Sequence, residues 1–70
     1  MVEKNLVNTL KVQRARKDLT QEELAGLVQV TRKTINTVEN GIYIPSTYLA
    51  LKLAKVLGTS VEELFQIKEQ

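Results

Sequence analysis

The chain has 70 residues, of which 43% are hydrophobic, and it contains neither cysteine nor histidine. This length suits one domain, residues 1–70, near the smallest size at which a core is sufficient without cross-links. The composition excludes disulfides and thiolate metal sites and removes the commonest general base. Ten basic and eight acidic residues give a net charge of +2. That charge is too small to indicate a polyanionic partner. Only the placement of the charges along the chain can indicate one.

Several functional classes find no support in the sequence. No segment resembles a signal peptide or is apolar for long enough to span a bilayer, so we expect a cytoplasmic protein with no membrane partner. The acidic pairs at positions 22–23 and 62–63 are explained by the preference of helix N-termini for negative charge. Because no pair of nucleophile and base is visible, we expect no enzyme, no cofactor and no metal.

The first predicted helix carries an arginine on its apolar side. Leu6, Leu10 and Arg14 are four residues apart and share one stripe of a helix that runs to about residue 17. One interpretation is a side chain that lays its stem along the core and keeps its charge in water. The other is a partly buried ion pair with Glu39. Periodicity alone leaves both open.

The second predicted helix has a clear start signal. Thr20 can accept a hydrogen bond from a free backbone N–H while Glu23 reaches back, an arrangement called a capping box. The following residues supply an inner face that consists of Leu19, Leu24, Ala25, Leu27 and Val28. We therefore expect a short amphipathic helix that starts at about residue 21 and breaks near residues 29–30.

The third predicted helix, about residues 31–40, has two sides of different chemistry. Thr31 can cap it, and at about 100° per residue one side carries Thr31, Thr34, Ile35 and Val38. The other side carries Arg32, Lys33, Asn36, Thr37 and Asn40. An ordinary surface helix would place acids four residues from its bases, and this second set contains no acid. Cationic, amide and hydroxyl groups of this kind read base edges in the major groove of DNA.

A connector and a fourth helix follow. Gly41 ends the third helix, because glycine accepts the left-handed conformation of a C-terminal cap. Tyr43 in the connector can either enter the core or donate its hydroxyl to a phosphate. Ser46 can cap a fourth helix, in which apolar residues recur at helical spacing until Gly58.

The C-terminal region predicts a short fifth helix, and it carries more apolar residues than such a helix needs for the core. Ser60 and Glu63 form another capping box, after which Val61, Leu64 and Phe65 are expected to face inward. Ile67 remains apolar on an otherwise polar tail. Val2, near the other end of the chain, can pair with this tail as a short strand.

The segment LTQEELAGLVQVTRKTINTVENG, residues 19–41, resembles the helix-turn-helix of the lambda-repressor and Cro-like (XRE-type) family of DNA-binding regulators. Pro45, Ser46 and the later LKLAKVLGTSVEELF extend the resemblance to roughly residues 10–65. It implies an all-α bundle of five helices with the helix-turn-helix at about residues 21–40. The family often has glycine at the turn where this chain has Gln29, so we expect a strained but tolerated variant. The resemblance also favours the ion pair of Arg14 with Glu39.

The leading interpretation is a transcriptional regulator, most simply a repressor, that binds double-stranded DNA at a pseudo-palindromic operator as a homodimer. Bases would be read by Arg32, Lys33, Asn36 and Thr37, and phosphates would be held by Gln21, Thr31, Asn40 and Tyr43. The dimer contact is expected within about residues 60–70, from Leu64, Phe65 and Ile67. The alternative is a protein-interaction module, such as an antitoxin or adaptor, in which DNA binding is secondary.

Overall fold

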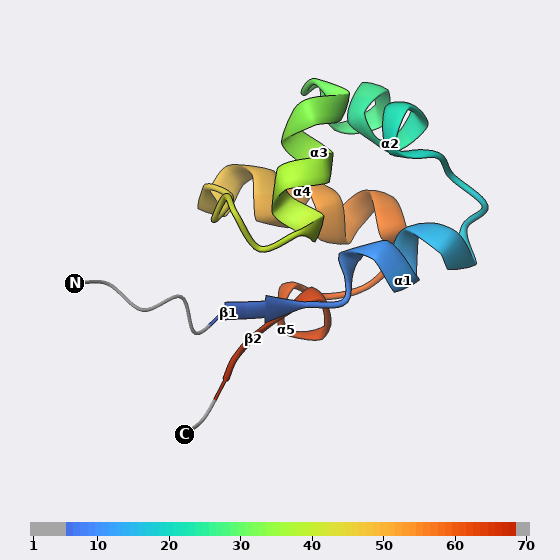
Figure 1. The fold of residues 1–70 in the computed structure, drawn as a ribbon. Coiled ribbons are helices and arrows are strands. Elements are labelled where there is room, and N and C mark those ends of the chain that lie inside the picture. The colour runs from blue at the N-terminus through green and yellow to red at the C-terminus, as the bar shows by residue number, and fades with distance from the viewer. Residues whose placement is uncertain (1–5, 69–70) are drawn as a thin grey trace.

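The computed structural model describes residues 6–68, which form five α-helices and one two-stranded antiparallel sheet (Figure 1). In chain order the elements are β1 (Leu6–Asn8), α1 (Leu10–Arg16), α2 (Gln21–Val28), α3 (Arg32–Glu39), α4 (Thr47–Leu57), α5 (Val61–Leu64) and β2 (Phe65–Ile67). The predicted five-helix architecture is confirmed, as is a short pairing of the two ends of the chain. Within the described residues, no helix is long and apolar enough to cross a membrane.

The sheet corrects the predicted start of the first helix. Residues Leu6–Asn8 form a strand that pairs antiparallel with Phe65–Ile67, so α1 begins only at Leu10. The prediction of a helix that includes Leu6 is therefore wrong. Val2, which was expected to take part in the pairing, lies outside the described residues.

Hydrogen bonds at the junction of β1 and α1 explain where the helix starts. The side-chain oxygen of Asn8 accepts from the backbone N–H of Leu10 at 3.0 Å, while the N–H of Thr9 donates to the carbonyl of Leu64 at 2.9 Å. These groups are thus satisfied by the Asn8 side chain and by the last residue of α5, and not by an earlier helical turn. The Asn8 amide also donates to the carbonyl of Val38 at 3.1 Å, which ties this junction to the last turn of α3.

Side-chain caps set the starts of the other helices. The Thr20 hydroxyl accepts from the N–H of Glu23 at 3.0 Å, and the Glu23 carboxylate accepts from the N–H of Thr20 at 2.8 Å, which completes the predicted capping box. A cap hydroxyl likewise accepts from the N–H three residues on in the other three helices, at Thr31, Ser46 and Ser60. Each cap satisfies one backbone donor that a helix start would leave without a partner.

The turn between α2 and α3 is the strained variant that the sequence predicts. Gln29 ends α2 with φ at 64°, in the left-handed region that is costly for a residue with a side chain. Its side-chain oxygen accepts a hydrogen bond from the Lys52 ammonium at 2.9 Å. This bond links the turn to α4.

The core lies where all five helices meet. Its largest fully buried side chains come from every helix: Leu10, Leu24, Val28, Ile35, Val38, Leu53 and Leu64. Leu27, predicted to belong to the inner face of α2, is instead 55% exposed. The buried side chains of α2 centre between Leu24 and Ala25, and Leu27 points roughly 100° away from that direction at the helical angle per residue. The side chains of this core cluster are all apolar, and the cluster contacts one side of α3.

Candidate nucleic-acid interface

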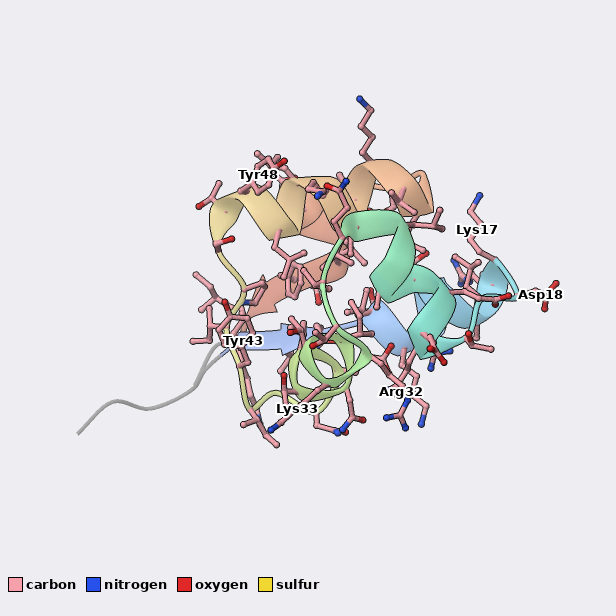
Figure 2. The ribbon with its side chains drawn as sticks, turned by 90° about the horizontal axis from the view of Figure 1, so that it is seen from above. Lys17, Asp18, Arg32, Lys33, Tyr43 and Tyr48 are labelled. Atoms are coloured by element: carbon pink, nitrogen blue, oxygen red, sulfur yellow. The ribbon has the colours of Figure 1, made fainter. Side chains whose placement is uncertain are left out.

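The outer side of α3 is a surface without negative charge. Ile35 and Val38 are buried and turn that side of the helix into the core, whereas Arg32 and Lys33 are exposed. Figure 2 shows both cations projecting from α3 on the side away from α4. Asn36 and Thr37 are half-buried on the same helix. The structure therefore presents the predicted base-reading residues from one helix, with two cations at its start.

Glu39, the acidic residue of α3, is not exposed on this surface. The Glu39 side chain is 3% exposed and the Arg14 side chain 15%, and their Oε2 and Nε atoms lie 2.7 Å apart. A second contact joins Arg14 Nη2 to Glu39 Oε1 at 3.4 Å, so the pair is two-pronged. Arg14 Nη1 also donates to the carbonyl of Leu19 at 2.7 Å. The arginine thereby neutralises Glu39 and joins α1 to α3.

A chain of amide hydrogen bonds runs from this ion pair to the reading surface. Gln21 Nε2 donates to Glu39 Oε1 at 3.0 Å and to Asn36 Oδ1 at 3.2 Å. Asn40 Nδ2 donates to the same Asn36 oxygen at 3.2 Å. Gln21 and Asn40 therefore both hold the Asn36 side chain through its oxygen. Its Nδ2 group has no hydrogen-bond partner within residues 6–68 and can donate to a base acceptor.

The Gln21 side chain lies within the hydrogen-bond network that holds Asn36. Both hydrogens of its amide nitrogen are used inside the protein, so the amide has only its acceptor oxygen left for a ligand. An acceptor oxygen does not bind a phosphate. Side-chain phosphate contact by Gln21 would break the network, whereas backbone N–H groups at the start of α2 suit an anion. Sequence spacing did not indicate this network, because Gln21 and Asn36 lie on different helices.

The other predicted contact residues surround the same side of α3. The Thr31 hydroxyl accepts from the N–H of Thr34 and lies 3.1 Å from the Thr34 hydroxyl. The Thr37 hydroxyl donates to the carbonyl of Thr34 at 2.9 Å, which uses its only hydrogen. Tyr43 is 46% exposed, so it is not a core residue, and Figure 2 shows it on the Lys33 side of α3.

Two short helices joined by a tight turn, the second with one side buried and the other cationic, define a helix-turn-helix DNA-binding domain. Residues 10–64 match the sequence profile of the family described as helix-turn-helix. The chain belongs to this family, in its lambda-repressor/Cro-like (XRE-type) form, whose members are DNA-binding transcriptional regulators.

Similar proteins come from distant organisms. An uncharacterized helix-turn-helix-type transcriptional regulator of Methanocaldococcus jannaschii is 48% identical over 83% of this chain and 88% of its own. Among solved structures, the restriction-modification controller protein C.AhdI from Aeromonas hydrophila is 37% identical, with a TM-score of 0.72 over 77% of this chain and 82% of its own. The clp gene regulator ClgR from Corynebacterium glutamicum is 33% identical, with a TM-score of 0.71 over 74% of this chain. The match spans 55% of ClgR.

Proposed function

We propose that this protein is a transcriptional repressor that binds a pseudo-palindromic operator as a homodimer and places α3 in the major groove. The observation that carries the proposal is the fixed outer side of α3, where Arg32 and Lys33 are exposed and Asn36 offers an amide donor. Arginine and lysine recognise guanine, and an asparagine amide recognises adenine. Occupying an operator is enough for repression, because the bound protein blocks access to the DNA.

Phosphate contacts would fix how the domain sits on the duplex. The first turn of α2 offers backbone N–H groups at the positive end of a helix dipole, which favours a phosphate oxygen. Thr31, Asn40 and Tyr43 surround α3 and carry groups that can donate to phosphates. These contacts orient the protein and carry no sequence information of their own.

Selection of bound duplexes from a random DNA pool tests this function. We expect one enriched motif with two-fold symmetry and half-sites about one helical turn, ~34 Å, apart. Affinity for the motif should fall steeply as salt increases, because cationic side chains displace counterions from phosphates. A pool with no enriched motif after repeated rounds would contradict the proposal.

A second candidate function is a protein-interaction module of the antitoxin or adaptor kind. The observation in its favour is a pair of apolar side chains on the outside of α4, where Tyr48 is 70% exposed and Leu51 is 56% exposed. Such a module would bind DNA weakly and with little preference between sequences. The same selection experiment distinguishes the two candidates.

The homodimer would form at the end of the molecule that carries the sheet. Leu64, one of the residues expected in the contact, is fully buried in the core and has no surface to offer a partner. Phe65 lines a hollow of about 300 Å³ between the sheet and α4, and Ile67 is 72% exposed. We therefore assign the contact to Phe65, Ile67 and this hollow, as one patch that meets its own copy.

Replacing Ile67 by Glu is expected to convert a dimer into a monomer, because an isologous contact would bring the two new charges together. Sedimentation of Ile67→Glu beside the unaltered protein measures this. The matched control is Val12→Glu, which alters a similarly exposed apolar residue on α1 and should leave the dimer intact. If Ile67→Glu also sediments as a dimer, the contact lies elsewhere.

Replacing Gln21 by Ala is expected to change base preference as well as affinity. Without the Gln21 amide, Asn36 loses one of the two donors that orient it, so discrimination at the base it reads should weaken. Titration against the enriched motif and its single-base variants measures this. Equal weakening on every duplex would instead return Gln21 to a phosphate contact.

A further inference from the structure

The turn between α2 and α3 is contacted from outside the helix-turn-helix. Gln29 adopts the left-handed conformation there, with φ at 64°. This conformation is less favourable for a residue with a side chain than for glycine. The Gln29 side-chain oxygen accepts a hydrogen bond from the ammonium group of Lys52, on α4, at 2.9 Å. A residue of another helix thus stabilises the strained position.

The core holds both neighbours of Gln29 but not Gln29 itself. Val28 is buried and Val30 packs against the core, whereas Gln29 is exposed between them. A hollow of about 270 Å³ lies between this stretch and α4, and both Gln29 and Lys52 line it. The hydrogen bond from Lys52 therefore acts on the residue of the turn that lies outside the core.

Lys52 is itself oriented by a neighbour on α4. Tyr48 lies four residues earlier, and the Lys52 ammonium is 5.0 Å from the centre of its ring. Residues four apart share one side of a helix, and a cation is attracted to the face of an aromatic ring. The ring narrows the range of positions open to a long side chain, so less entropy is lost when Lys52 binds Gln29. We call these two contacts of Lys52 the Lys52 tether.

The turn determines the direction in which α3 starts. The N–H of Val30 donates to the carbonyl of Ala25 at 3.0 Å, and α3 begins two residues after Val30. A change in the dihedral angles just before Val30 would rotate the start of α3 against α2 and shift Arg32 and Lys33. Figure 2 shows Tyr48 on the side of the molecule away from these two cations. The tether therefore acts on them through the turn.

We propose that Lys52 is a positioning residue for DNA recognition, which through Gln29 holds the turn in the conformation that presents the cations of α3 to the major groove. This inference rests on the proposed placement of α3 and adds to it a residue of α4 that does not touch the DNA. Because the tether orders the turn in the free protein, little ordering remains when DNA binds.

Replacing Lys52 by Met is expected to weaken binding to the enriched operator roughly fivefold, the fold-change that corresponds to one net hydrogen bond. Methionine keeps an unbranched apolar stem and lacks the donor. Lys52→Arg can still donate to the Gln29 oxygen and should retain most of the affinity. The matched control is Lys55→Met, which removes the same charge from an exposed position on α4 and should bind as the unaltered protein does.

Gln29→Gly separates the tether from a general effect of charge. Glycine adopts the left-handed conformation readily and offers Lys52 no side-chain acceptor. In this background Lys52→Met should therefore leave the affinity unaltered. The same fivefold loss in both backgrounds would overturn the tether, because Lys52 would then act through its charge alone.

Hydrogen exchange in the free protein tests the tether without an operator. The Val30 N–H should exchange roughly fivefold faster in Lys52→Met than in Lys52→Arg, whereas amides within α4 should exchange equally in both variants. Equal exchange at Val30 overturns the inference even if an operator is found. Faster exchange with unaltered operator affinity also overturns it, because the turn would then not position α3. If no motif is enriched, the proposed function fails, and exchange at Val30 still decides whether the tether exists.

Discussion

Replacing Arg14 by Met is expected to lower the free energy of unfolding by roughly 3–5 kcal/mol, a large part of the stability of a domain of this size. The substitution leaves the Glu39 carboxylate, whose side chain is 3% exposed, without its counter-charge. It also frees the Leu19 carbonyl that Arg14 Nη1 contacts. Denaturant unfolding of the variant beside the unaltered protein measures the loss.

A double-mutant cycle with Glu39→Gln separates the ion pair from the packing of the arginine stem. Coupling well above about 1 kcal/mol is expected for a buried, two-pronged pair, whereas an exposed pair would stay below that value. Arg16→Met is the control, because Arg16 is exposed on the same helix and its change should stay within about 0.5 kcal/mol. Coupling indistinguishable from zero would mean that Arg14 only covers the core with its stem.

Replacing Arg32 or Lys33 by Ala is expected to weaken binding to the enriched operator by about 1–3 kcal/mol, roughly 5- to 150-fold in affinity. The loss should be concentrated at one base, because a side chain that contacts guanine through two hydrogen bonds discriminates against the other bases. Titration of each variant against single-base variants of the operator locates that base.

Lys55→Ala is the matched control for charge. Lys55 is exposed in the last turn of α4, and its removal lowers the net charge by the same unit without touching α3. It should leave base preference unaltered. If Arg32→Ala, Lys33→Ala and the double variant all keep the base preference of the unaltered protein, bases are read by other residues.

Local signals predicted the helices well. Thr20 and Glu23 form the capping box that their spacing indicates, and Gln29 takes the left-handed conformation at the turn. Both features depend on residues within one or two turns of each other, which a sequence displays directly. The start of α1 could not be found in this way, because the partner that makes Leu6–Asn8 a strand is Phe65–Ile67 at the far end of the chain.

The exposed side of α3 was predictable as a set of residues, whereas the hydrogen-bond network behind it was not. Helical periodicity separates Arg32 and Lys33 from the buried Ile35, since all of them lie on one helix. The orientation of Asn36 depends on Gln21, which reaches it across a helix crossing. The prediction that Leu27 faces inward was wrong for a related reason. Periodicity defines one side of a helix, but it does not give the width of the strip that neighbouring helices cover.

The bond from the Asn8 amide to the Val38 carbonyl has a consequence for the geometry of a paired protein. Asn8 belongs to the sheet, where we place the contact between copies, and Val38 belongs to the last turn of α3. In the proposed homodimer, the two reading helices would thus be joined by a short, rigid frame. Adding one base pair between half-sites shifts one of them by ~3.4 Å and rotates it by ~35° about the duplex axis. A frame without a hinge would have to bend the DNA to follow such a change, so the proposed dimer would discriminate between operators by the spacing of their half-sites as well as by their sequence.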